Sequence, residues 1–298
     1  MDNPTDHGSI SATMTLSHRI SQAPILVAPG VYDALTAALA TEAGAEALYL
    51  TGAGVAYTRL GRPDIGLVSM NEVVEVVSLI RDRVATPLIV DADTGWGNAL
   101  NVERTVRMLE RAGANAIQLE DQSFPKRCGH LAEKRLISAA EMAGKIRAAV
   151  DARRSKATLI IARTDAIAVD GFEDAMTRAR LYADAGADML FVEAPASGHE
   201  LAAIPKALKG VLPLMANMVE GGKTPVKNAA ELQSMGFAMV IFPGAIVRMI
   251  IPAARELYRA VLGEGTSQPV RDRMLDFETL NQTLGTAEML ARGKKYEG

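Results

Sequence analysis

One arrangement recurs along this chain: a helical segment ends at a glycine, and a short apolar run follows directly. The glycine stands where a left-handed residue ends many helices. It is found at Gly44, Gly113, Gly186 and Gly236. Alternating helices and strands fold into a parallel sheet covered by helices, so this repeat restricts the chain to the α/β class.

Eight strands and their helices account for most of the 298 residues. Each expected strand is a short apolar run, typical of a strand buried on both faces. The strands are predicted at residues 25–28, 47–50, 87–90, 116–119, 158–162, 189–192, 214–216 and 239–242. Helices are predicted at residues 34–43, from an N-cap at Asn71, at 102–112, from an N-cap at Ser138 to about 153, at 172–185 and at 245–262.

Eight such units in a chain of this length predict a (β/α)8 TIM barrel. The alternative is a doubly wound open sheet, in which functional residues gather where the strand order reverses. Polar residues end nearly every strand here, and this favours the barrel. Before the barrel, residues 1–22 are predicted to be a flexible arm, because they are polar and lack the apolar core of a signal peptide.

The remaining residues, 23–298, are predicted to form one domain with a C-terminal helical extension over 266–292. The repeat does not require this extension, but its apolar side chains need burial. It either packs on a neighbouring subunit or folds back on its own barrel.

Composition excludes several classes of function. A net charge of −3 leaves no basic surface for nucleic acid, and no apolar run approaches the ~20 residues that cross a membrane. The single cysteine, Cys128, excludes an internal disulfide. Without an export signal, the chain is expected in the cytoplasm, acting on a small molecule.

A barrel brings the carboxyl ends of all its strands to one face. Three carboxylates there, Asp91, Asp93 and Glu120, cannot all stay ionised together without a cation. Hard oxygen ligands with no nearby histidine or cysteine favour Mg²⁺ or Mn²⁺. In the alternative interpretation, Asp93 caps the next helix and Asp91 pairs with Arg163. The other polar residues expected on this face are Tyr49, Thr51, Glu193 and Asn217.

The loop after the fourth strand, residues 126–130, carries Lys126, Arg127, Cys128, Gly129 and His130. Cations beside a thiol make it more reactive, although the loop is alternatively a solvated basic turn. With a metal present, Lys126 and Arg163 would be free to hold the carboxylates of a small acid. The glycine-rich pieces at 52–54 and 221–222 suit backbone contacts to an anion.

Six motifs together resemble the isocitrate lyase and phosphoenolpyruvate mutase superfamily. They lie at residues 49–52, 90–97, 118–122, 126–130, 162–165 and 216–222, and the resemblance extends over everything from Ile25 onward. Loop 126–130, with the sequence Lys-Arg-Cys-Gly-His, is the most specific motif. It marks the carbon–carbon lyase branch, which comprises the isocitrate, 2-methylisocitrate and 2,3-dimethylmalate lyases.

The resemblance implies a Mg²⁺-dependent retro-aldol (retro-Claisen) cleavage of a 2-hydroxy di- or tricarboxylate. The products would be a 2-oxo acid such as pyruvate and a second carboxylate. By matching position, the metal would be surrounded by Asp91, Asp93 and Glu120, with Asp64 in the outer shell and Mn²⁺ as a substitute for Mg²⁺. The family also implies a homotetramer of helix-swapped dimers.

The resemblance further assigns roles to the remaining site residues. Tyr49 would take the hydroxyl proton, and Cys128 would protonate the carbanion of the departing acid, supported by His130. Arg163 would act in both catalysis and binding. Substrate would be bound by Thr51, Gly52, Ala53, Lys126, Gly129, Arg163, Glu193, Asn217 and Arg248.

Two positions bear on the substrate. Arg248 matches a carboxylate-binding arginine of 2-methylisocitrate lyases, but Phe277 stands where those enzymes have another arginine. A charge-assisted pair contributes ~1.5–3 kcal/mol, so its loss favours a malate-type acid such as 2,3-dimethylmalate. The alternatives are oxaloacetate decarboxylation or phosphonopyruvate- or carboxyphosphonoenolpyruvate-type mutase chemistry on the same metal site, with Cys128 a bystander. A third alternative is a non-catalytic binding protein.

Overall fold

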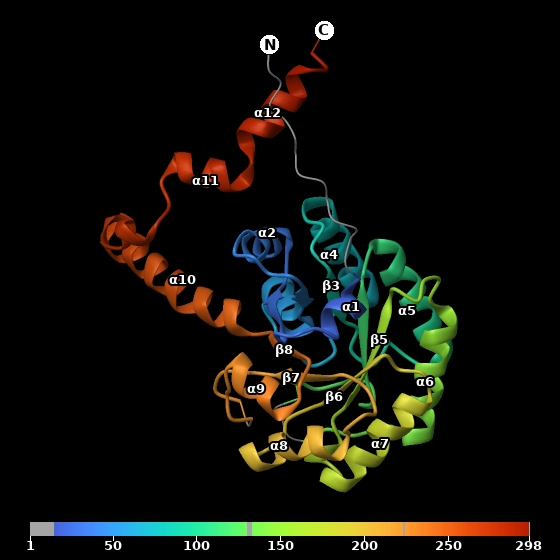
Figure 1. The fold of residues 1–298 in the computed structure, drawn as a ribbon. Helices are drawn as coiled ribbons and strands as arrows, with labels where there is room; N and C mark the ends of the chain where they lie inside the picture. Colours follow the sequence, from blue (N-terminus) through green and yellow to red (C-terminus); the bar gives the residue numbers. More distant parts are fainter. Residues whose placement is uncertain (1–14, 130–132, 223, 298) are drawn as a thin grey trace. The chain divides into compact units, whose positions relative to one another are not determined.

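The computed structural model describes residues 15–129, 133–222 and 224–297, and the chain divides into two compact units, residues 1–247 and 248–298. In the first unit, eight parallel strands close into a barrel in sequence order, with β8 pairing to β1 (Figure 1). This confirms the predicted TIM barrel, and the open sheet is wrong. The strands are β1 (Leu26–Val31), β2 (Leu48–Leu50), β3 (Leu88–Asp91), β4 (Ala116–Glu120), β5 (Leu159–Thr164), β6 (Met189–Val192), β7 (Leu214–Asn217) and β8 (Met239–Phe242).

Helices cover the outside of this barrel, and side-chain caps fix where most of them begin. The Ser138 hydroxyl accepts from the Glu141 amide, which confirms the predicted N-cap. The predicted N-cap at Asn71 is wrong, because Ser69 and Glu72 cap each other reciprocally two residues earlier. The helices are α2 (Ala34–Glu42), α4 (Met70–Arg83), α5 (Ala99–Ala112), α6 (Ala139–Ala152), α7 (Phe172–Asp184), α8 (Gly198–Ala207) and α9 (Ala229–Met235).

The four glycines of the sequence repeat all have a positive φ, as predicted: 91° at Gly44, 106° at Gly113, 102° at Gly186 and 110° at Gly236. A residue with a Cβ would be strained there, so each glycine ends its helix and turns the chain toward the next strand. Between β2 and α4 lie a short helix, α3 (Gly52–Val55), and a π-helical segment, η1 (Ala56–Leu60).

The core of the first unit has two layers. Leu88 and Val90 belong to the layer shared with the helices, whereas Ile89 and Phe191 belong to a second cluster formed mostly by the other faces of the strands. A short helix, α1 (Leu16–Ile20), adds two buried side chains, Leu16 and Ile20, to the second cluster. The expectation of a loose arm is therefore wrong for residues 16–20, while residues 1–14 lie outside the described part.

The second unit is helical. The described elements that reach into it or lie within it are α10 (Ala245–Glu264), η3 (Gln268–Arg273), α11 (Phe277–Leu284) and α12 (Thr286–Lys294). Arg273 pairs with Glu256 at 2.6 Å, and large apolar side chains such as Phe277 and Leu290 are exposed. Its exchange between subunits stays a prediction. Over the described residues, no helix is long and apolar enough to span a bilayer.

Replacing Leu88 by alanine is expected to lower the free energy of unfolding by about 2–5 kcal/mol, because its fully buried side chain would leave a cavity in the core. The matched control is Leu100→Ala, since Leu100 is 71% exposed and its loss should cost little. Urea denaturation of both variants measures the difference. Equal losses in the two variants would contradict this assignment of the core.

Candidate active site

The carboxylates of Asp91 and Asp93 lie together at the end of β3, as the sequence predicted. A Cβ placed on Gly52 would lie 3.2 Å from an oxygen of each. The Gly52 amide donates to Asp91 Oδ2 at 3.3 Å, so the anion it meets is Asp91 itself. Asp93 has a left-handed backbone with φ 47°. Asp93 does not cap α5, because the side chain of Asn98 does so.

Lys126, predicted to bind a substrate carboxylate once a metal is present, is paired with protein carboxylates in this structure. Its Nζ lies 2.6 Å from Asp64 Oδ1 and 2.8 Å from Asp93 Oδ1, and only 4% of the side chain is exposed. Burial alone would lower the pKa of Lys126, but Asp93 and Asp64 raise it well above its usual value. The ammonium therefore stays charged and is not free for a substrate carboxylate in this structure.

Burial also shifts the acids of this cluster. It raises the pKa of Asp93 to about 7, with Asp91 and Asp64 adding to the rise and Lys126 opposing it. It raises the pKa of Glu120 well above its usual value, despite the opposing charge of Arg163. Both carboxylates are thus costly to ionise without further positive charge.

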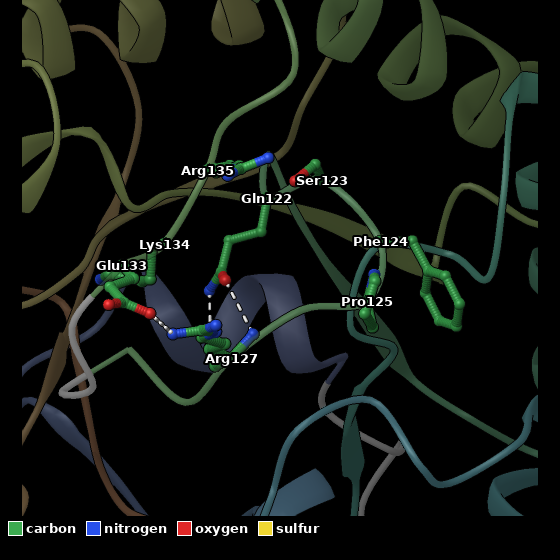
Figure 2. Close-up of a pocket in the computed structure, with 8 residues that line it drawn as sticks. All are labelled: Gln122, Ser123, Phe124, Pro125, Arg127, Glu133, Lys134 and Arg135. Atoms are coloured by element: carbon green, nitrogen blue, oxygen red, sulfur yellow. Dashed lines mark hydrogen bonds and ion pairs between the residues drawn. The ribbon is translucent and has the colours of Figure 1, made fainter.

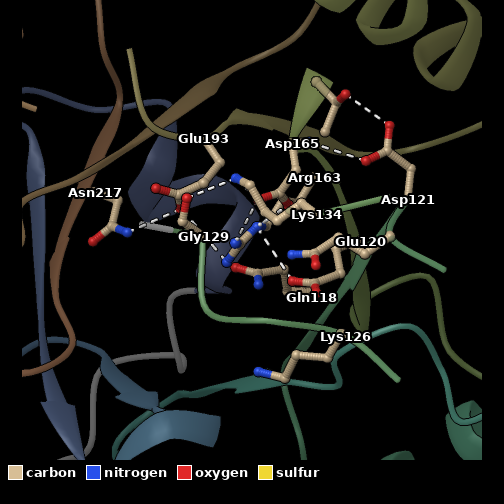
Figure 3. Close-up of polar contacts among 12 residues, drawn as sticks. Gln118, Glu120, Asp121, Lys126, Gly129, Lys134, Arg163, Asp165, Glu193 and Asn217 are labelled. Carbon is tan, nitrogen blue, oxygen red and sulfur yellow. Dashed lines mark hydrogen bonds and ion pairs between the residues drawn. The ribbon is translucent and has the colours of Figure 1, made fainter. Parts of the chain in front are cut away.

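Arg163, at the end of β5, contacts carboxylates at the ends of its own strand and of the neighbouring strands β4 and β6 (Figure 3). It donates to both oxygens of Asp165, at 2.9 and 3.1 Å, and lies 3.3 Å from Glu120 and 3.5 Å from Glu193. Its guanidinium stacks on the Phe191 ring, 5.1 Å from the centroid. Asn217 donates to Glu193 at 3.0 Å. The structure therefore brings Glu120, Arg163, Glu193 and Asn217 together.

Tyr49 is 2% exposed and its hydroxyl donates to Gln118 Oε1 at 2.9 Å. The Gln118 amide donates in turn to Asp91 Oδ1 at 3.2 Å. Burial, then Asp91, raises the pKa of Tyr49 well above its usual value, so the phenol keeps its proton in the absence of further positive charge. The role of Tyr49 as the route for the hydroxyl proton stays a prediction. Gln118 was missed, although a polar residue inside a buried apolar strand was a usable signal.

The loop around Cys128, described over residues 126–129 and called the Cys128 loop below, is held against the barrel by hydrogen bonds of its backbone. The Gln122 carboxamide accepts from the Arg127 amide at 2.9 Å and donates to the Arg127 carbonyl at 2.8 Å (Figure 2). The Cys128 amide donates to the carbonyl of Asp64 at 3.2 Å. These bonds place the loop beside the Asp64–Lys126–Asp93 cluster, which disfavours the solvated-turn alternative. A cavity of about 540 Å³ flanks the loop and is lined by Gln122, Ser123, Phe124, Pro125, Arg127, Glu133, Lys134 and Arg135.

Gly129 fits tightly against the site, because an added Cβ would lie 2.6 Å from Arg163 Nη2 and from Glu193 Cγ. Two further predicted residues belong to the segment that follows β2. Thr51 Oγ1 caps α3 by accepting from the Gly54 amide at 3.2 Å, and Ala53 lies within α3. Arg248 lies on α10, in the second unit, and His130 lies outside the described residues.

Asp121, beside Glu120, forms a buried support that sequence reasoning did not assign. It accepts from the Thr164 hydroxyl at 2.7 Å, the Tyr182 hydroxyl at 2.8 Å and the Asp165 amide at 2.9 Å. The bond to the Asp165 amide fixes the turn after β5, and with it the partner of Arg163. Figure 3 shows the hydrogen bond between Asp121 and Asp165.

A hard divalent cation suits the donors present. Asp91, Asp93 and Glu120 offer only oxygen, and Glu120 Oε1 is buried without a hydrogen-bond partner among the described residues. Among the residues that the structure describes, no three acidic, histidine or cysteine side chains are close enough together to ligate one ion directly. This arrangement fits Mg²⁺, which keeps several waters and takes only one or two carboxylates.

Comparison with known proteins gives consistent matches. Residues 17–262 match the family described as phosphoenolpyruvate phosphomutase. The chain is 42% identical over 266 residues to 2,3-dimethylmalate lyase of Eubacterium barkeri, covering 89% of this chain and 91% of that protein. It is 48% identical over 261 residues to 2-methylisocitrate lyase of Aeropyrum pernix, covering 88% and 83%.

Two solved structures extend the comparison. Oxaloacetate acetylhydrolase in complex with the inhibitor 3,3-difluorooxalacetate has a TM-score of 0.89 and 35% identity, covering 95% of this chain and 96% of that one. Phosphonopyruvate hydrolase in complex with oxalate and Mg²⁺ has a TM-score of 0.85 and 29% identity, covering 95% and 98%.

Proposed function

The chain belongs to the phosphoenolpyruvate mutase and isocitrate lyase superfamily, and on this premise we propose that it is a carbon–carbon lyase acting on a 2-hydroxy di- or tricarboxylate. The observation that carries the proposal is the position of the Cys128 loop. The loop is bonded to Asp64 beside the acids of β3, and Gly129 packs against Arg163 and Glu193. Both relatives compared above are named as lyases.

Mg²⁺ is the proposed cofactor, with Mn²⁺ as a substitute. The superfamily includes a structure that contains oxalate and Mg²⁺. In this chain Asp91, Asp93 and Glu120 would hold the ion, directly or through water, and Asp64 would support them. When bound, such an ion acts as a Lewis acid that stabilises negative charge on substrate oxygens.

The protein side chains supply the rest of the reaction. Arg163, held by Asp165, presents a fixed guanidinium for a substrate carboxylate, and Asn217 and Glu193 complete that wall. Tyr49, as its phenolate, takes the hydroxyl proton, the substrate oxygen becomes the carbonyl of the 2-oxo acid, and the electron pair of the carbon–carbon bond passes to the departing acid. The Cys128 thiol then gives its proton to that carbon. The packed loop keeps water away from the carbanion.

The similarity to oxaloacetate acetylhydrolase favours a second candidate, the cleavage of a 2-oxo rather than a 2-hydroxy acid. Both candidates need the same anion-binding wall at Arg163. They differ in whether water adds to the carbonyl carbon before cleavage, whereas in both the electron pair of the breaking carbon–carbon bond passes to the departing acid. Substrate preference therefore separates them.

A panel of acids with Mg²⁺ is the direct test: 2,3-dimethylmalate, 2-methylisocitrate, isocitrate, citramalate and oxaloacetate. We expect pyruvate release from 2,3-dimethylmalate to have the highest kcat/KM, followed by 2-methylisocitrate, because Phe277 replaces a cation expected for a third carboxylate. Coupled detection of pyruvate, glyoxylate and oxalate measures all products. Glyoxylate from isocitrate alone would contradict the preference, and turnover of oxaloacetate alone would favour the second candidate.

We also propose a cytoplasmic homotetramer. A reducing compartment would keep the single cysteine as the thiol that the reaction needs. Exposed apolar side chains on α10, α11 and α12, among them Tyr258, Leu262 and Phe277, suit burial against other subunits. Light scattering after size exclusion would give the mass of the assembly.

A further inference from the structure

Lys134 follows the Cys128 loop and is almost fully buried. Its Nζ donates to the Gly129 carbonyl at 2.6 Å and pairs with Asp165 Oδ1 at 2.8 Å. The exposed fractions of the two side chains are 1% for Lys134 and 0% for Asp165. A buried ammonium that contacts a loop carbonyl is a strong and directional tie. No feature of the sequence distinguished Lys134 from a surface lysine.

Asp165, the carboxylate that Lys134 contacts, is itself held by several hydrogen bonds. Asp165 accepts twice from Arg163, and its amide donates to Asp121. Burial alone would raise the pKa of Asp165, but Arg163 and Lys134 hold it below its usual range, so the carboxylate remains charged. Lys134 therefore connects the loop to the same carboxylate that orients Arg163 (Figure 3).

Gly129 has little freedom to adjust, because Arg163 and Glu193 occupy the space where its side chain would be. The direction of its carbonyl is then set by the Lys134 ammonium, and Cys128 precedes it directly. On the other side of Cys128, Lys126 ties the loop to Asp64 and Asp93. The two lysines thus hold the loop at two places, toward β5 and toward β3.

We propose that Lys134 is a positioning residue that fixes Cys128 through the Gly129 carbonyl and couples the loop to the Arg163–Asp165 pair. This inference rests on the proposed function, in which Cys128 delivers a proton. Lys134 itself contacts no reacting atom. A 1 Å displacement of a reacting group costs about 100-fold in rate, so loss of the tie should lower kcat more than it changes KM.

The test uses Lys134→Met, which keeps the length of the side chain and removes its donors, and Lys134→Arg as the conservative variant. Cys128 is the only cysteine, so iodoacetamide labelling followed by mass spectrometry reports on it alone. The labelling rate is taken on its high-pH plateau, where differences in thiol pKa no longer matter. Labelling requires no turnover, so it gives a result even if the proposed lyase activity is wrong.

We expect Lys134→Met to lower kcat about 100-fold, with KM within about threefold, and to raise the plateau labelling rate at least about fivefold. In Lys134→Arg, both kcat and the plateau labelling rate should lie close to their wild-type values. The matched control is Lys145→Met, since Lys145 is also buried and its Nζ donates to the Thr94 carbonyl at 3.2 Å, but it does not tie the loop. Its labelling rate should equal that of the wild type.

A folded Lys134→Met protein with wild-type kcat and labelling rate would overturn the proposal. Removal of Lys134 leaves Asp165 with one cation fewer, which can prevent folding. The double variant Lys134→Met/Asp165→Asn removes both charges of the pair, and its labelling rate gives the same decision. A raised labelling rate of Cys128 in the double variant supports the proposed positioning by Lys134, and an unchanged rate overturns the proposal.

Discussion

Replacing Cys128 by serine is expected to lower kcat for the 2-hydroxy acid substrate by about 10³-fold, within the range for loss of a general acid. Serine keeps the shape of the side chain, but its hydroxyl is a far weaker acid than a thiol. Because the loop is held through the backbone at Arg127, Cys128 and Gly129, the substitution should leave the loop in place. Steady-state kinetics with pyruvate detection measures the loss.

Two further measurements make this result specific. Substrate affinity, determined by calorimetry, should stay within about threefold in Cys128→Ser, because Arg163 and its partners are untouched. Oxaloacetate turnover in the same variant separates the two candidate functions. Full lyase activity in Cys128→Ser would exclude the thiol as the acid, whereas loss of substrate binding would indicate a structural role.

Removal of the divalent ion is expected to have a comparably large effect. Treatment with EDTA should lower kcat by at least about 10³-fold, with recovery on adding Mg²⁺, because oxyanion stabilisation is often the largest catalytic contribution. Asp93→Asn should weaken Mg²⁺ binding by at least about 100-fold. Asparagine is chosen because it tolerates the left-handed backbone at this position.

The matched control is Asp82→Asn, an exposed carboxylate on α4, which should bind Mg²⁺ as the wild type does. Isothermal titration with Mg²⁺ alone measures affinity without any dependence on turnover. Unchanged affinity in Asp93→Asn would place the ion elsewhere. Activity that persists in EDTA at the wild-type rate would exclude the ion from the reaction.

The sequence predicted the barrel because the strand and helix signals are local and repeat eight times. Leu88, Ile89 and Val90 identify a strand whatever surrounds them, and Gly113 identifies the end of a helix. The start of α4 was misplaced because Asn71 and Ser69 are both good N-caps, and only the reciprocal bonds of Glu72 decide between them. The identity of the acids at the strand ends followed from the barrel topology.

The pairing of the charges could not be predicted in this way. Lys126 and Lys134 are close in sequence, yet one pairs with Asp64 and Asp93 and the other with Asp165. These choices depend on the path of the loop and on distances between side chains of different strands. The raised pKa of Tyr49 likewise follows from its burial and from the charge of Asp91, and the closed barrel also brings Gln118 to its hydroxyl.

The backbone of Asp93 has a consequence for how such a protein could be made more heat-resistant. A non-glycine residue in the left-handed region costs roughly 1–2 kcal/mol, and glycine would avoid that cost. Glycine would also remove a carboxylate that pairs with the buried Lys126 ammonium, and breaking a buried ion pair costs about 3–5 kcal/mol, so the substitution is expected to lower stability overall. Engineering for heat resistance should therefore leave residue 93 unchanged.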